Sequence, residues 1–166
     1  MPAAILLIGV PGSGKSKLAM EMLRSQRTGT PASTQLISPD LIRQKLYGSA
    51  SIQGAWGQIW AEVQQEFTNA AASKHSIIYD ATNYKREYRQ EVIALARQHG
   101  FEPVTGLWLD VPLWLCLIRN QHRDRPVPDE IVIEMHTCLS RTPPHLSEGF
   151  DSLMFKQENK ESEWID

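Results

Sequence analysis

Residues 9–16 read Gly9-Val10-Pro11-Gly12-Ser13-Gly14-Lys15-Ser16. This stretch fits the pattern G-x-x-x-x-G-K-[ST] at every fixed position. The apolar, β-branched run from Ala3 to Ile8 precedes it and predicts a buried strand. Lys17 to Arg24 follows it and is rich in helix-forming residues. A strand, a glycine-rich turn and a helix in this order form the context that a phosphate-binding loop requires.

The loop predicts an anion site. Its glycines let consecutive backbone N–H groups converge on a phosphate, and the helix N-terminus adds partial positive charge. Lys15 can reach terminal phosphates, and the Ser16 hydroxyl can hold Mg²⁺. An ordinary glycine turn is the alternative, and the complete pattern at this place disfavours it. The predicted nucleotide-phosphate residues are Gly9, Pro11, Gly12, Ser13, Gly14, Lys15 and Ser16.

Composition indicates an ordinary globular chain. Its 166 residues suit one domain, and 42% are hydrophobic and 22% charged. The net charge of −2 does not favour a nucleic acid or an anionic membrane over the whole surface. No apolar stretch approaches a membrane span, and the N-terminus lacks the basic start of a secretion signal. Cys116 and Cys138 have no metal-ligand spacing. We therefore expect a cytoplasmic protein with reduced thiols and no membrane partner.

Strand and helix signals alternate along the chain. This order predicts an α/β fold, a P-loop NTPase three-layer sandwich with a mostly parallel sheet and helices on both faces. We expect one domain over 1–157 and a charged tail over 158–166. Polar loops are expected over 25–34 and 47–57, the second one mobile. The predicted strands are 3–8, 35–38, 76–79, 104–109 and 149–156, and the predicted helices are 17–24, 40–46, 58–73, 85–99, 112–120 and 129–139.

Polar residues follow two of the predicted strands. In parallel sheets ligands bind beyond the carboxyl ends of the strands, so these residues can share one cleft with the P-loop. Asp80, at the end of a buried strand, has the position of a Walker B aspartate that holds Mg²⁺ or its waters. Thr82 and Asn83 add short hydrogen-bonding groups for a substrate, although Asp and Asn also favour plain turns.

Asp40 and Arg43 are three residues apart and lie on one face of a short predicted helix. A carboxylate facing the γ-phosphate could accept a proton from an attacking hydroxyl, and a neighbouring arginine could hold an anionic group. A helix-capping aspartate beside a surface arginine is the competing interpretation.

Three arginines, Arg119, Arg123 and Arg125, lie at the end of a predicted helix and in the break after it. Such a cluster is usually a solvated helix end. In P-loop kinases, however, arginines neutralise charge in the transition state. Trp56 and Trp60 border the predicted mobile loop and could form a substrate wall, but packing is the favoured interpretation; Trp108 is expected in the core.

The ordered set of motifs resembles the polynucleotide 5′-hydroxyl kinase family. The matching pieces are G-V-P-G-S-G-K-S at 9–16, D-L-I-R at 40–43, D-A-T-N at 80–83, L-D-V-P at 109–112, R-N-Q-H-R at 119–123 and E-G-F-D at 148–151. The resemblance runs from Ile5 to about Phe155, without the phosphatase or ligase domain that family members often carry. Small P-loop kinases that act on sugars or antibiotics share most of these motifs.

The resemblance implies an ATP-dependent kinase. Lys15 and Ser16 would bind ATP phosphates and Mg²⁺, Asp40 would be the general base and Arg43 would contact a phosphate of the acceptor. Arg123 would stabilise the transferring phosphoryl group, with Arg119 near the nucleotide. The expected acceptor is a nucleic-acid 5′-hydroxyl; a small-molecule kinase and a non-kinase regulatory ATPase are the alternatives. Two absences disfavour the switch class: Asn159-Lys160 does not continue as N-K-x-D, and alanine, not glutamate, follows Asp80.

Overall fold

The computed structural model describes residues 1–25 and 33–158. Most of the expected polar loop at 25–34 and of the expected tail at 158–166 lies outside these residues. The proposed domain boundary at 157 therefore remains a prediction. Within the described ranges no helix is long and apolar enough to cross a membrane.

The sheet is fully parallel and has five strands in the order β2-β3-β1-β4-β5. The predicted α/β fold is confirmed, and every predicted strand is present with small shifts at its ends. β1, the strand that leads into the P-loop, lies in the middle of the sheet. The strands are β1 (Ala4–Ile8), β2 (Thr34–Ile37), β3 (Ser76–Asp80), β4 (Val104–Asp110) and β5 (Ser152–Gln157).

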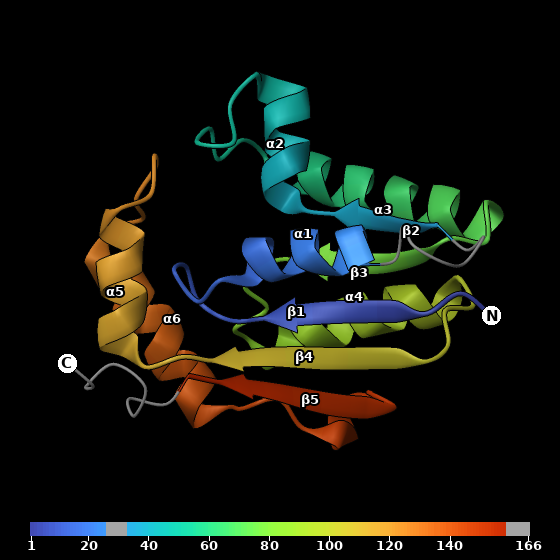
Figure 1. Ribbon diagram of the computed structural model, residues 1–166. Helices are drawn as coiled ribbons and strands as arrows, with labels where there is room; N and C mark the ends of the chain where they lie inside the picture. Colours follow the sequence, from blue (N-terminus) through green and yellow to red (C-terminus); the bar gives the residue numbers. More distant parts are fainter. Residues whose placement is uncertain (26–32, 159–166) are drawn as a thin grey trace.

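Helices lie on both faces of the sheet, as Figure 1 shows for α1 and α4. α5 and α6 lie beyond the carboxyl ends of the strands, where the P-loop also emerges (Figure 1). The helices are α1 (Lys15–Ser25), α2 (Pro39–Tyr47), α3 (Trp56–Ala72), α4 (Arg86–Gln98), α5 (Leu113–Gln121) and α6 (Asp129–Arg141), and a short 3₁₀ helix, η2 (Leu146–Glu148), precedes β5.

The core consists of apolar residues of the strands and of the helix faces packed against them. Ile59, Val63 and Phe67 are spaced four residues apart along α3, so they share one face of the helix, and all three are fully buried. The Phe67 ring meets the edges of Tyr79 on β3 and Phe101, with centroids 6.0 and 5.8 Å apart. Burial of such large apolar side chains supplies most of the driving force for folding. β1 and β3 pair in parallel with Leu7 opposite Asp80, so the carboxyl ends of the two strands lie side by side.

The structure differs from the prediction in three local features. η2 was not predicted, so the last strand begins at Ser152 and not at residue 149. α3 begins at Trp56, within the expected loop, and leaves that indole 50% exposed. Trp108 is only partly buried, because its ring packs against Phe155 on the edge strand β5 with centroids 5.7 Å apart.

Candidate nucleotide and phosphoryl-transfer site

The loop between β1 and α1 has the backbone geometry that its glycines permit. Gly12 has φ +85°, in the left-handed region. A Cβ on Gly12 would lie 2.2 Å from the Cys116 carbonyl oxygen of α5, so a side chain cannot be placed there. The close approach of α5 therefore requires glycine at this position.

Several charged groups act on Lys15. Its Nζ donates to the Val10 carbonyl oxygen at 3.2 Å. Burial lowers the pKa of Lys15; the carboxylates of Asp80 and Asp40 act in the opposite direction, and the Arg123 guanidinium adds to the lowering. Asp40, Asp80 and Arg123 come from three separate segments. The fold thus brings these charges close enough to influence the Lys15 pKa.

Ser16 and Asp80 form an oxygen pair that suits Mg²⁺. The Ser16 Oγ donates to Asp80 Oδ2 at 2.8 Å, and Asp80 is 8% exposed at the end of β3. Mg²⁺ is usually held by one or two carboxylate or hydroxyl oxygens, with substrate phosphates and water as the other ligands. No cluster of three or more His, Cys, Asp or Glu exists in the described ranges that would make a separate metal cage. Ser16 and Asp80 therefore fit the ion, completed by phosphate oxygens.

A groove of about 210 Å³ adjoins the P-loop between α1, α5 and the end of β5. Ser13 lines it, and its buried hydroxyl lacks a hydrogen-bond partner among the described residues. Buried polar groups are rarely left unpaired, so this hydroxyl fits a ligand such as a nucleotide phosphate. Arg119 also lines the groove and forms a bidentate ion pair with Glu158, at 3.1 and 2.6 Å. Sequence reasoning missed Glu158, which lies in the expected tail.

Asp40 and Arg43 form an ion pair at the start of α2. Arg43 Nη1 donates to Asp40 Oδ1 at 2.9 Å, and the side chains are 16% and 62% exposed for Arg43 and Asp40. Ser38, and not Asp40, is the N-cap residue of α2. The capping interpretation of Asp40 is therefore not supported. Arg43 Nε also donates to the Gln53 carbonyl oxygen at 3.4 Å, which joins α2 to the following loop.

Arg123 and Arg125 are exposed in the segment between α5 and α6. His122 is exposed as well, and its Nδ1 lies 2.8 Å from the Ile118 carbonyl oxygen. The positive charge of Arg123 contributes to the lowering of the Lys15 pKa, and the role of Arg123 in phosphoryl transfer remains a prediction.

Asn83 joins the loop after β3 to the neighbouring strand. Its side chain is 3% exposed, and Nδ2 donates to the Leu7 carbonyl oxygen of β1 at 2.7 Å. This bond gives the amide nitrogen a structural role, and the substrate contact expected of Asn83 remains a prediction. Thr82 is partly buried, and its carbonyl oxygen accepts a hydrogen bond from the Gly9 N–H at 3.0 Å.

The sequence profile of a protein family described as AAA domain (AAA_33) matches residues 5–141. The chain belongs to this family. The L-seryl-tRNA(Sec) kinase of Methanococcus maripaludis is 27% identical over 141 residues, which cover 80% of this chain and 50% of that protein. The L-seryl-tRNA(Sec) kinase of Mus musculus is 37% identical over 70 residues, 41% of this chain and 19% of that protein. The chain spans at most half the length of either relative.

Solved structures share the fold. A chain of the Pnkp1/Rnl/Hen1 RNA repair complex superposes with a TM-score of 0.73 at 20% identity, over 85% of this chain and 45% of that chain. A gluconokinase from Sinorhizobium meliloti 1021 superposes with a TM-score of 0.59 at 16% identity, over 94% of this chain and 82% of that chain. At these identities the likeness shows the fold alone, and the choice of acceptor is a matter for proposal.

Proposed function

We propose that this chain is a kinase that moves the γ-phosphoryl group of ATP to a hydroxyl carried by a polynucleotide. The observation that carries the proposal is the pairing of the Ser16 hydroxyl with Asp80 Oδ2, at 2.8 Å, directly after a complete P-loop. A P-loop alone would serve any nucleotide-binding protein. Asp40 and Arg123 would add the acid–base and charge-neutralising groups that transfer needs.

In this proposal the P-loop holds the phosphates of ATP. The backbone N–H groups of Gly12, Gly14, Lys15 and Ser16 would bind phosphate oxygens together with the Ser13 hydroxyl and the Lys15 ammonium. Pro11 has no N–H, and the N–H groups of Gly9 and Ser13 already donate to the Thr82 and Val10 carbonyl oxygens. The groove beside Arg119 would take the rest of the nucleotide. Ser16 and Asp80 would hold Mg²⁺, which would supply positive charge to the nucleotide phosphates.

Asp40 is the proposed general base. It accepts the acceptor hydroxyl proton as that oxygen bonds to the γ-phosphorus and the bond to the β,γ-bridging oxygen breaks, which leaves ADP. Arg43 Nη1 pairs with Asp40 Oδ1, which keeps the carboxylate in one orientation. Arg123 offsets the charge that develops during transfer, and Arg43 contacts a phosphate next to the attacked hydroxyl. Thr82 stays a proposed contact on the acceptor side.

The surroundings of Trp56 support a polynucleotide acceptor. Trp56 is 50% exposed and stacks on Trp60 with ring centroids 6.2 Å apart, three residues after the Gln53 carbonyl that Arg43 contacts. A half-exposed indole near an arginine suits a nucleobase next to a phosphate. A nucleic-acid 5′-hydroxyl is the first candidate. The seryl hydroxyl of an aminoacylated tRNA is the second, favoured by the 141-residue similarity to L-seryl-tRNA(Sec) kinase.

The test is transfer of labelled phosphate from γ-labelled ATP by the purified chain. The acceptor panel contains RNA and DNA oligonucleotides with free 5′-hydroxyls, seryl-tRNA, nucleosides and gluconate, with Lys15→Ala as the control enzyme. We expect label on the 5′-hydroxyl oligonucleotides and none with Lys15→Ala. Label on seryl-tRNA alone selects the second candidate. Label on gluconate or nucleosides alone, or ATP hydrolysis without transfer, contradicts the polynucleotide proposal.

A further inference from the structure

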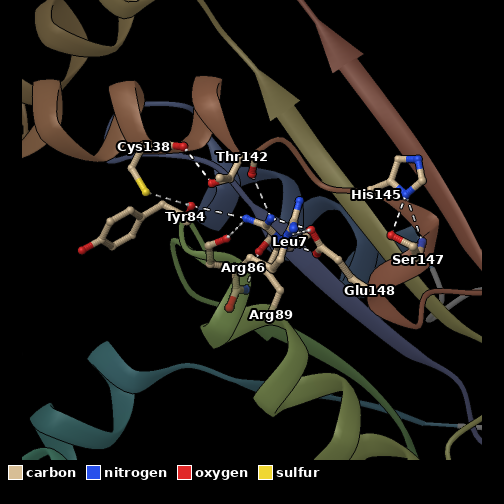
Figure 2. A network of polar contacts seen from close by, with 10 residues as sticks. Leu7, Tyr84, Arg86, Arg89, Cys138, Thr142, His145, Ser147 and Glu148 are labelled. Carbon is tan, nitrogen blue, oxygen red and sulfur yellow. Dashed lines mark hydrogen bonds and ion pairs between the residues drawn. The ribbon is translucent and has the colours of Figure 1, made fainter.

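Arg89, on α4, is the largest side chain among the fully buried residues of the described ranges, with 0% exposure. Its guanidinium forms a bidentate ion pair with Glu148 of η2: Nε donates to Oε2 and Nη2 to Oε1, both at 2.7 Å. The Glu148 side chain is 1% exposed. Figure 2 shows the two side chains facing each other at the centre of a polar network. A charge buried this completely is costly unless every polar group is paired.

The remaining N–H groups of Arg89 bind backbone carbonyls from two other elements. Nη1 donates to the Asn83 and Tyr84 carbonyl oxygens at 3.1 and 3.3 Å, and Nη2 donates to the Thr142 carbonyl oxygen at 2.9 Å. Together with the two bonds to Glu148, five hydrogen bonds use all five N–H donors of the guanidinium. One side chain thus joins the loop after β3, the end of α6 and η2 (Figure 2).

The loop that Arg89 holds is the one that carries Asp80 into the site. Asn83 in this loop has φ +49°, a strained conformation for a residue other than glycine. Its side chain is bonded to Leu7 of β1, and the Thr82 carbonyl accepts from Gly9 of the P-loop. The loop is therefore tied to the P-loop on one side and to Arg89 on the other.

The second element that Arg89 holds is α6. Arg123 lies in the segment that leads into this helix, and the bond from Arg89 to Thr142 lies just beyond the helix's other end. The same guanidinium therefore binds both the loop that follows Asp80 and the far end of the helix that follows Arg123.

We propose that Arg89, fixed by Glu148, is a positioning residue that holds the Asp80 loop and α6 in the geometry needed for Mg²⁺–ATP binding and phosphoryl transfer. This inference rests on the proposed kinase function, in which Ser16 and Asp80 hold the ion. Arg89 touches neither nucleotide nor acceptor; it acts through the backbone of residues 83, 84 and 142.

The experiment compares Arg89→Lys with Arg97→Lys. Lysine keeps the charge that pairs with Glu148, but its three donors on one nitrogen cannot reproduce the planar fork that reaches three elements. Arg97 is the matched control, because it lies two turns later on α4, pairs with Asp151 at 2.8 Å and binds the Gly149 carbonyl, without touching the loop after β3. If Arg89→Lys does not fold, Glu148→Gln takes its place in the experiment, because glutamine nearly keeps the shape of the glutamate side chain.

Three quantities are measured on each variant, at temperatures where its melting curve shows it folded. They are ATP affinity by calorimetry with and without Mg²⁺, kcat for phosphoryl transfer, and the melting temperature. For Arg89→Lys we expect a loss of about 10- to 100-fold in the Mg²⁺-dependent part of ATP affinity and in kcat, the usual effect of removing a partner that orients metal ligands. ATP affinity without Mg²⁺ should change by less than about 3-fold, and Arg97→Lys should match the wild type in all but melting temperature.

A folded Arg89→Lys protein with wild-type Mg²⁺ dependence and kcat would overturn the proposal and leave Arg89 a purely structural residue. An equal loss in Arg97→Lys would overturn it as well, because the effect would then not follow the contacts to the Asp80 loop. The calorimetric comparison needs no acceptor, so it tests Arg89 even if the acceptor proposed above is wrong.

Discussion

At the scale of single residues, Lys15 shows how a side chain placed for a ligand can lower the stability of the ligand-free protein. Burial lowers the pKa of Lys15, so the charged ammonium is disfavoured in the nucleotide-free protein despite the carboxylates of Asp80 and Asp40. A phosphate at the P-loop would supply the missing negative charge. The residue is thus placed for its ligand at some expense in stability, as is common at functional sites.

We therefore predict that Lys15→Met melts no lower than the wild type at pH 7 without nucleotide, and loses the rise in melting temperature that ATP and Mg²⁺ cause. The sign follows from linkage. Because the folded pKa lies below the ordinary 10.5, the unfolded chain holds more protons between the two values, and wild-type stability rises with pH in that window. Lys15→Met should lack this rise. Melting curves from pH 7 upward measure both effects, and a variant less stable than the wild type without ATP would refute the argument.

Asp40 allows chemistry to be separated from nucleotide binding. Its carboxylate lies on α2, outside the P-loop, and pairs with Arg43. We predict that Asp40→Asn lowers kcat by about 10²- to 10⁴-fold, the usual contribution of a general base. ATP affinity should change little, because the P-loop holds ATP. Steady-state kinetics and calorimetry give the two quantities; a collapse of ATP binding with normal turnover at saturation would assign Asp40 to the nucleotide site.

At the scale of elements, the last turn of α5 and the segment after it carry two arginines, Arg119 and Arg123, with different surroundings. Arg119 is on α5, lines the groove beside α1 and pairs with Glu158. Arg123 is exposed and acts on Lys15. Arg119 thus lies at the groove, and the proposed role of Arg123 is to neutralise charge on the transferring phosphoryl group.

We predict that Arg123→Ala reduces kcat by more than it weakens ATP binding, because the charge that it offsets develops only during transfer. Arg119→Ala should do the reverse, raising the Kd for ATP with a smaller effect on kcat. The same calorimetric and kinetic assays apply to both variants. Small and equal effects would instead mean that the arginines are a solvated helix end.

Sequence periodicity predicts elements well where local signals are strong. The P-loop pattern and the alternation of strands and helices predicted the parallel sheet and the place of Asp80 at the end of β3. The bond from Asn83 to Leu7 could not be predicted, because a polar residue after a strand gives the same sequence pattern whether it faces a ligand or binds the neighbouring strand. Arg89 and Glu148 were missed as a pair: they lie 59 residues apart, and only the packing of α4 against η2 shows that both are buried.

At the scale of the whole molecule, charge restricts how an acceptor is bound. The net charge is −2. On the acceptor side, Arg43 is the residue that we propose to contact phosphate. Neutralising phosphates releases counterions, so each contact adds to the salt dependence of binding. A protein without a long basic track should recognise the end of a strand and ignore its length.

We predict that a short oligonucleotide, or a nucleoside 3′-phosphate, serves almost as well as a long strand. The logarithm of kcat/KM against the logarithm of salt concentration should have a slope of about −0.7 for each phosphate contact on a single strand, so one to three contacts give about −0.7 to −2. A nucleoside without the 3′-phosphate should be much poorer, and Arg43→Ala should erase that difference because the arginine is the proposed partner of that phosphate. Kinetics over an acceptor-length series at several salt concentrations test this. A steep slope that grows with strand length would show an extended binding track and refute recognition of the strand end alone.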